Sequence, residues 1–285
     1  MNNLPFLRKL GQREIWRRLI CERLNEPLHL QLTAACVAAF GSFRSRVYWD
    51  CIIRQHNAYG ILRACDRARE CGQNAVTVVE FGVGPGAGLL NMQAIAMEAE
   101  RATGVTVFVD GFDTGNGMPK PEGWRDHPDL YGSGDFALPN RAALEARCIP
   151  GMTCLHVGYI AKTVDEWDPI APIGYIVLDV DYWSSAKDSL RVFTKPATKF
   201  QPVIDLYLDD CDLERHSQFA GEQLAIRDWN DIREPVKIER NIFLRCNRPM
   251  QRARWLSKMW TVHQFKHPLR TEPRMMPAVL QNPYL

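Results

Sequence analysis

The apolar positions of this chain change their spacing along its length, and the change predicts its elements. From residue 76 onward, short runs rich in Val, Ile and Tyr alternate with segments in which apolar residues recur every three or four positions. The runs predict five buried strands, at residues 76–81, 105–111, 153–159, 174–181 and 203–210. The helical spacing predicts helices at residues 87–103, 140–146, 185–193 and 222–232. This alternation favours an α/β fold with a doubly wound parallel sheet covered by helices on both faces.

The C-terminal part follows a different pattern. Residues 236–246 and 255–265 are both β-rich, and the turn-like segment 247–252 between them leaves no room for a crossover helix. Two strands joined in this way must be antiparallel. The prediction is therefore five parallel strands plus a C-terminal antiparallel pair.

The N-terminal part reads as helical. Residues 6–24 place apolar side chains near one face and six Lys or Arg around the other, and residues 28–72 continue with helical spacing. The basic helix fits either a membrane-surface anchor or a helix packed on its own domain or on a second subunit of a homo-oligomer; we favour packing. The predicted organisation is an N-terminal helical extension (1–74), an α/β domain (75–267) and an irregular tail (268–285).

Composition and charge narrow the class of protein. The chain has 285 residues, of which 46% are hydrophobic and 24% charged, which suits one large domain with additions. A net charge of +2 gives no reason to expect a nucleic-acid partner. The nine cysteines form no C-x-x-C pair and no zinc spacing, and no apolar signal core opens the chain, so we expect reduced cysteines in a cytoplasmic protein.

The first predicted strand leads into a glycine-rich turn. Glu80 ends the strand, and Gly82, Gly84, Gly86 and Gly88 follow at alternate positions before the helix. Such a turn lets the backbone approach a ligand closely at a helix N-terminus. The spacing G-x-G-x-x-A also satisfies the dinucleotide fingerprint, with Asp110 downstream. However, the anionic Glu80 would repel a pyrophosphate and suits a cationic ligand.

Acidic residues follow the predicted strands. In open α/β sheets, ligands lie beyond the C-terminal ends of the strands. Carboxylates gathered there repel one another unless a cation or a hydroxyl-rich ligand lies between them. The residues are Glu80, Asp110, Asp113, Asp179, Asp181, Asp209 and Asp210.

Three further segments carry a family resemblance. Residues 111–119 read GFDTGNGMP, residues 178–190 read LDVDYWSSAKDSL and residues 208–211 read LDDC. They resemble, in the same order, the GFDSFEGLP, DGDLYESTxDAL and VDDY segments of the macrocin and mycinamicin type of macrolide-sugar O-methyltransferases. That family belongs to the class I S-adenosylmethionine-dependent methyltransferases, which have a Rossmann-like sheet. The resemblance spans roughly residues 76–232, with Cys211 in place of the family's Tyr.

The resemblance implies a methyl transfer from S-adenosylmethionine to a hydroxyl of a small molecule or sugar-containing metabolite, assisted by magnesium. By this resemblance Asp113 would bind the cofactor ribose. Asp181 and His216 are the candidates in this chain for accepting the hydroxyl proton. The methionine part of the cofactor would lie on Glu80, Gly82, Gly84 and Gly86. The metal would be held by Asp179, Asp209 and Asp210, a set of oxygen ligands that suits Mg²⁺.

Two alternatives come from other classes of protein. An NAD(P)-dependent oxidoreductase could use the same sheet, but the chain contains no Tyr-x-x-x-Lys. A methyltransferase fold that holds a cofactor or a partner without turnover is the other alternative.

Overall fold

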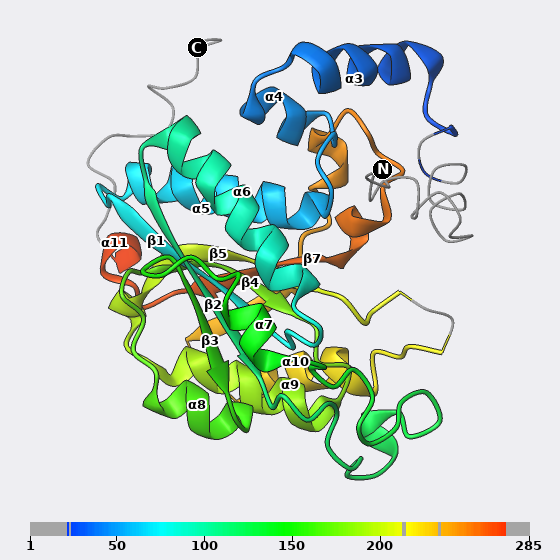
Figure 1. The fold of residues 1–285 in the computed structure, drawn as a ribbon, viewed down its shortest axis with the longest axis vertical. Helices are drawn as coiled ribbons and strands as arrows, with labels where there is room; N and C mark the ends of the chain where they lie inside the picture. The colour runs from blue at the N-terminus through cyan, green and yellow to red at the C-terminus, as the bar shows by residue number, and fades with distance from the viewer. Residues whose placement is uncertain (1–21, 23, 213–214, 233–234, 272–285) are drawn as a thin grey trace.

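A seven-stranded sheet forms the centre of the molecule (Figure 1). The computed structural model describes residues 22, 24–212, 215–232 and 235–271. The strand order is β3-β2-β1-β4-β5-β7-β6, in which the first five strands are parallel and β7 runs antiparallel to both β5 and β6. The predicted α/β fold class is confirmed. The strands are β1 (Ala75–Phe81), β2 (Thr106–Asp113), β3 (Thr153–Val157), β4 (Ile173–Leu178), β5 (Phe200–Leu208), β6 (Val236–Arg240) and β7 (Met259–Gln264).

Helices cover both faces of the sheet, as its apolar runs require. In Figure 1, α5 (Gln55–Glu70) and α6 (Ala87–Thr103) lie above the sheet. Below it lie α8 (Ile160–Glu166), α9 (Trp183–Leu190) and α10 (Gly221–Ile232). Successive side chains of β1 enter opposite cores: Val76 and Val78 pack on the α5 and α6 side, and Val79 and Phe81 on the other.

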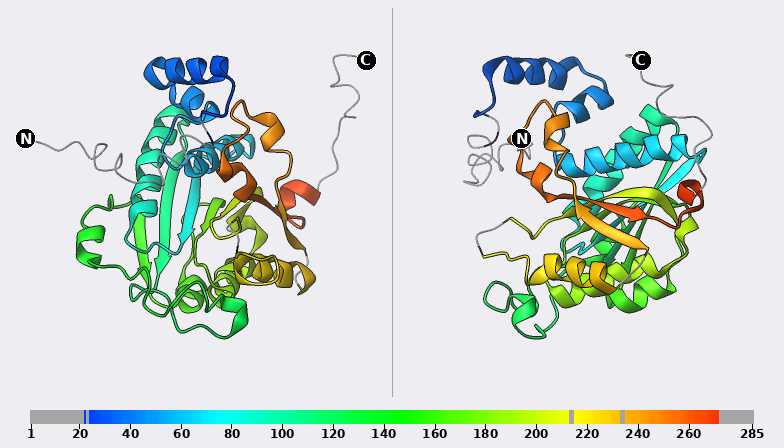
Figure 2. Two further views of the ribbon diagram at one scale, coloured as in Figure 1. Left: turned by 90° about the vertical axis from the view of Figure 1, so that its right-hand side faces the viewer. Right: turned by 180° about the vertical axis from the view of Figure 1, so that it is seen from behind.

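The remaining helices lie at the periphery. Figure 2 shows α3 (Leu28–Phe40) and α4 (Phe43–Tyr48) beyond the layer that α5 and α6 form. Helix α7 (Arg141–Glu145) begins after Asn140, whose side chain accepts a hydrogen bond from the Ala143 N–H. Among the described residues, no helix has both the length and the apolar character needed to cross a membrane. Short 3₁₀ turns occupy Trp124–Asp126, Arg191–Thr194, Ala197–Lys199, Arg245–Asn247 and Arg254–Lys258.

Several predicted elements differ in detail from the structure. The predicted basic helix at 6–24 lies almost wholly outside the described residues. Helix α5, within the predicted N-terminal extension, packs on β1, β4 and β5, and the predicted irregular tail begins with the single helical turn α11 (Pro268–Thr271). Helix α8 was not predicted.

The prediction of a strand over the whole of residues 236–246 was wrong. Strand β6 ends at Arg240, because the Ile242 N–H already turns back to the Arg240 carbonyl at 2.9 Å. The next buried residue, Leu244, leaves the sheet and joins the core on the α5 side. Strand β7 starts only at Met259, after the 3₁₀ turn Arg254–Lys258.

A buried ion pair ties the N-terminal helices to the segment between β6 and β7. Asp50 follows α4 and is 2% exposed. Its two carboxylate oxygens accept hydrogen bonds from the Arg248 guanidinium at 2.5 Å and from the Trp255 indole N–H at 2.9 Å. Arg248 also donates to the Val47 carbonyl at the end of α4. One charge network therefore joins residues about 200 positions apart in the chain.

This network predicts a large loss of stability when one charge is removed. Arg248→Met leaves the Asp50 carboxylate buried without its cation, and the free energy of unfolding should fall by about 3–5 kcal/mol. Urea denaturation measures this loss. Arg245→Met is the matched control, because Arg245 lies in the same segment but is exposed, and it should change the unfolding free energy little. An equal, small effect of both substitutions would contradict the role given to the pair.

Candidate functional site

The glycine turn between β1 and α6 is built by close approach of neighbouring groups. A Cβ added to Gly82, whose φ is +88°, would lie 1.7 Å from the Asp179 carbonyl oxygen. At Gly88 a Cβ would lie 1.7 Å from Glu80 Oε1, and at Gly86 it would lie 2.4 Å from Leu144 Cδ1. These three glycines are required by the packing of the turn itself.

Gly84 is different from the other glycines of the turn. Its φ is +49°, and an added Cβ would meet nothing closer than the Phe136 carbonyl oxygen at 3.5 Å. A Cβ at this position would therefore make ordinary van der Waals contact with Phe136 and clash with nothing. Gly84 also lines the cavity described below, so its lack of a side chain keeps room for a ligand.

Glu80 lies behind the turn, at the end of β1. Its side chain is almost fully buried, and Oε2 has no hydrogen-bond partner among the described residues. Burial raises the pKa of this carboxyl to about 8; the positive charge of Arg54 opposes the rise, and Asp113 adds to it. A buried acid with an unpartnered oxygen facing a cavity suits a ligand that carries a donor or a positive charge.

Asp113, at the end of β2, holds the turn from the other side. One carboxylate oxygen accepts a hydrogen bond from the Gly84 N–H at 2.8 Å, and the other accepts one from the Gly115 N–H at 2.6 Å. Each oxygen keeps a second lone pair. Asp113 therefore fixes the turn and can still accept from a ligand hydroxyl.

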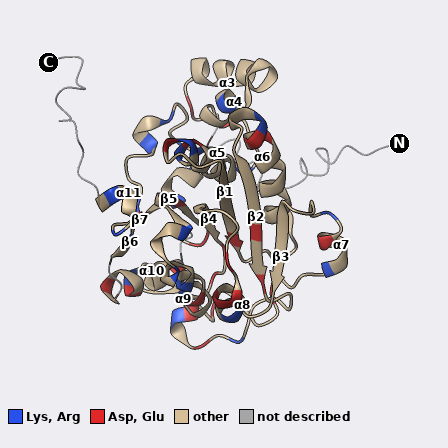
Figure 3. Cartoon of the chain, turned by 90° about the vertical axis from the view of Figure 1, so that its left-hand side faces the viewer, with Lys and Arg blue, Asp and Glu red and all other residues tan. Residues whose placement is uncertain are grey.

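A cavity of about 470 Å³ opens at this end of the sheet. The glycine turn and Glu80 form one wall, and the ends of β4 and β5 form another with Asp179, Asp181, Asp209 and Asp210. The loop after β2 closes it with Tyr131, Asp135 and Phe136. Acidic positions mark the lower parts of the central strands and the loops below them in Figure 3. The structure thus brings the predicted acids at the ends of β1, β2, β4 and β5 to one cavity, with the exception of Asp110, which does not line it.

Asp179, Asp209 and Asp210 form a group that could hold a metal ion. One oxygen from each lies within 4.8 Å of the others. Burial, and then the charges of Asp209 and Asp210, raise the pKa of Asp179 well above its usual value. Asp210 Oδ2 is buried and has no hydrogen-bond partner. Three oxygen donors with one unpartnered oxygen fit Mg²⁺, which binds carboxylates and keeps several waters.

Lys258 supplies part of the positive charge that this group needs. Its ammonium lies 3.2 Å from Asp209 Oδ1 and 3.1 Å from Asp212 Oδ1. The Tyr207 hydroxyl donates to Asp209 Oδ1 at 2.7 Å. Burial alone would raise the pKa of Asp209, but Lys258 and the Tyr207 hydroxyl together lower it below its usual value. The ionised form is therefore favoured at Asp209, whereas burial and the neighbouring acids disfavour it at Asp179.

The two predicted proton acceptors lie in different surroundings. Asp181 lines the cavity with a positive φ of 59°, and burial followed by the neighbouring Asp210 raises its pKa to about 9. His216 does not line the cavity. Its Nε2 lies 3.0 Å from the Tyr131 hydroxyl and 4.0 Å from Asp210 Oδ1, and burial lowers its pKa. His216 is therefore linked to the cavity through two residues that line it, Tyr131 by a hydrogen bond and Asp210 at longer range.

The structure adds two residues that the sequence did not reveal. Tyr131 donates to Asp210 Oδ1 at 3.2 Å, and burial together with Asp210 raises the pKa of its hydroxyl. Glu222, on α10, is fully buried and accepts the N–H groups of Val180 at 3.0 Å and Asp210 at 3.2 Å. It holds the loops after β4 and β5 together. Tyr131 stands in a loop without a periodic pattern of apolar residues. Glu222 resembles an ordinary acidic residue in the first turn of a helix. No sequence signal therefore marked either residue as part of the site.

No protein-family model matches the chain, and no curated protein matches it in sequence. Among solved structures, it is similar to the calicheamicin methyltransferase CalS11 at 16% identity, covering 93% of this chain and 95% of that one with a TM-score of 0.48. It is also similar to the O-methyltransferase NovP at 15% identity, covering 83% and 98% with a TM-score of 0.49. An O-methyltransferase from Bacillus cereus follows at 10% identity, covering 87% and 96% with a TM-score of 0.40. The strand order and the geometry of the cavity are the basis for the function that we propose for this protein.

The raised pKa of Glu80 predicts how stability depends on pH. The folded protein holds a proton on Glu80 between about pH 4.5 and pH 8, where the unfolded chain has lost it. The free energy of unfolding should therefore fall as pH rises through this window, and Glu80→Gln should remove that part of the slope. Urea denaturation of both proteins, without ligand, measures the difference. Parallel pH profiles would show that Glu80 titrates normally.

Proposed function

We propose that the protein is an S-adenosylmethionine-dependent methyltransferase that methylates a hydroxyl of a small molecule or sugar-containing metabolite with the help of Mg²⁺. The observation that carries this proposal is the buried, partly unpaired Glu80 behind a glycine turn in which an added Cβ would clash at Gly82, Gly86 and Gly88 but not at Gly84. A cofactor with an ammonium and a sulfonium group, and no phosphate, fits this wall. An NAD pyrophosphate would face Glu80, Asp113 and Asp179 in the same cavity.

The cavity residues would have separate roles in binding the cofactor and the metal. Glu80 and the turn hold the methionine part of the cofactor, and Asp113 accepts from a ribose hydroxyl. S-adenosylmethionine would supply the methyl group when bound. Asp179, Asp209 and Asp210 would hold Mg²⁺, which would supply a Lewis acid for the acceptor hydroxyl.

The hydroxyl proton has two candidate acceptors. Asp181 borders the cavity, but its pKa of about 9 keeps it protonated at neutral pH until a cation beside Asp210 lowers it. His216 is neutral because burial lowers its pKa, and it would take the proton through Tyr131. We favour Asp181 when metal is present, because it needs no relay. A non-catalytic cofactor-binding protein is the competing interpretation, and turnover tests it directly.

Gly84 provides the test of the cofactor. Gly84→Leu should abolish S-adenosylmethionine binding, because the side chain enters the cavity, while the protein stays folded. Gly104→Leu is the matched control: Gly104 also has a positive φ, +72°, with nothing within 4 Å of an added Cβ, but it lies at the far end of α6. Calorimetric titration with S-adenosylmethionine and with NAD measures both variants. Tight NAD binding without any response to S-adenosylmethionine would overturn the proposal.

The metal is tested by Asp209→Asn together with a chelator. Methyl transfer from labelled S-adenosylmethionine into a small-molecule extract should fall by roughly 100-fold or more in each case, since a Lewis-acid cation contributes several kcal/mol. Asp212→Asn is the control, because Asp212 also contacts Lys258 but lies outside the metal-binding group. Binding of S-adenosylmethionine should survive in all three. Full turnover of Asp209→Asn in the presence of chelator would exclude a metal role.

A further inference from the structure

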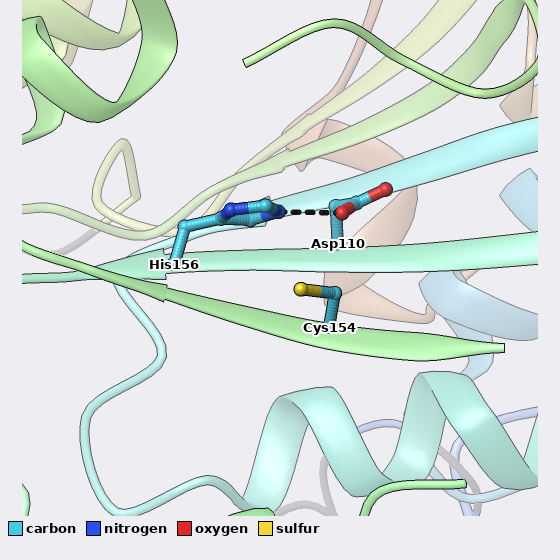
Figure 4. A group of neighbouring side chains, drawn as sticks. All are labelled: Asp110, Cys154 and His156. Carbon is cyan, nitrogen blue, oxygen red and sulfur yellow. Dashed lines mark hydrogen bonds and ion pairs between the residues drawn. The ribbon is translucent and has the colours of Figure 1, made fainter. Parts of the chain in front are cut away.

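A second group of metal-ligating side chains lies within the sheet, where β2 meets the edge strand β3. Asp110 on β2 and Cys154 on β3 are register partners, and His156 stands two residues further along β3. Side chains alternate between the faces of a strand, so all three point to the same face of the sheet. Figure 4 shows the Cys154 thiol beside the hydrogen bond that joins His156 to Asp110.

The geometry of the group is compact. One donor atom from each residue lies within 4.8 Å of the other two, and His156 Nε2 lies 2.6 Å from Asp110 Oδ1. The donors of a tetrahedral zinc site are about 3–4 Å apart, given bonds of about 2.0–2.3 Å. Rotation of the Asp110 carboxylate would open the short contact to this spacing without a change in the backbone.

The surroundings fix the imidazole and leave an entry path. The His156 ring stacks on Phe112 with centroids 4.5 Å apart and meets the edge of Trp167 at 6.1 Å. The Asp110 side chain is 9% exposed and that of His156 is 23% exposed. Cys154 is exposed on the edge strand, so an ion can approach from solvent on that side.

The donor set selects the kind of metal. A thiol, an imidazole and a carboxylate together suit Zn²⁺, whereas Mg²⁺ and Ca²⁺ take oxygen ligands. A thiolate and a carboxylate would also neutralise the two charges of the ion. We propose that Asp110, Cys154 and His156 bind a zinc ion with three protein ligands and a fourth position open to solvent. On binding, the Cys154 thiol releases its proton to solvent. The proton that His156 Nε2 shares with Asp110 also passes to solvent, so that Nε2 can bind the ion while Nδ1 carries the ring proton.

A zinc ion at this site would stabilise the part of the sheet that lies next to the cofactor cavity. Among the described strands, β3 pairs with β2 alone. An ion bound between the two strands would stabilise this edge of the sheet. Asp113, which fixes the glycine turn, ends the same strand β2 three residues after Asp110. The zinc site does not depend on the proposed methyl transfer, because its ligands lie outside the residues that line the cavity.

Cobalt binding tests the proposal with a signal that reports the thiolate. Titration of the full chain with Co²⁺, in a non-thiol reductant, should give a thiolate-to-cobalt charge-transfer band that saturates at one equivalent and is displaced by Zn²⁺. Cys154→Ser should remove the band. Cys154→Ser and His156→Ala should each weaken Zn²⁺ binding, measured by competition with a chromophoric chelator. Loss of an outer-shell partner already weakens metal binding by up to about 100-fold, so loss of a ligand should weaken it by roughly 100-fold or more.

Two control variants separate this site from other cation sites. Cys246→Ser removes an exposed cysteine outside the group and should leave the band intact. Asp209→Asn alters the oxygen-ligand group and should also leave it intact. Circular dichroism confirms that each variant is folded. A band that persists in Cys154→Ser, or that disappears in Cys246→Ser or Asp209→Asn, would overturn the proposal, as would a Zn²⁺ affinity unchanged by Cys154→Ser.

Discussion

Desolvation of carboxylates is the constraint on which the functional end of the molecule depends. Glu80 and Glu222 are buried and Asp179 is partly buried, and desolvation raises the pKa of each. Backbone N–H groups of Val180 and Asp210 stabilise Glu222, and Lys258 stabilises Asp209 next to Asp179. Glu80 Oε2 and Asp210 Oδ2 have no hydrogen-bond partner among the described residues, and both side chains line the cavity. The cationic cofactor and the Mg²⁺ proposed above would supply the missing partners.

Much of the fold could be predicted from the sequence, because buried parallel strands are continuous apolar runs that need no knowledge of their neighbours. The five parallel strands were found in this way, with ends displaced by a few residues. Helix α8, which follows the predicted strand at 153–159 directly and buries only Ile160 and Val164, was missed. The extent of β6 was mispredicted because Ile242, Phe243 and Leu244 look like strand residues, although only Leu244 is buried, and it packs away from the sheet.

The residues of the site also fall into those that could be predicted from the sequence and those that could not. Acids at strand ends, such as Asp113 and Asp179, could be predicted because sheet geometry alone brings strand ends together. Tyr131 could not, since its place depends on how a long loop folds back over the cavity. The group of Asp110, Cys154 and His156 was invisible for another reason: its ligands come from two strands that pair in space, and one of them is an acid with no metal-binding spacing. Cross-strand pairing is a property of the folded sheet and leaves no periodic trace in the chain.

Lys258 makes the charge balance at the ends of the central strands depend on the last described strand of the chain. Its ammonium compensates Asp209 and Asp212, yet it belongs to the turn that precedes β7, and β7 pairs with β5 on the side away from β4. Without this turn the acids after β5 would lose their lysine partner and repel one another. The antiparallel pair of β6 and β7 therefore completes the sheet and also brings a positive charge to the end at which the cavity opens.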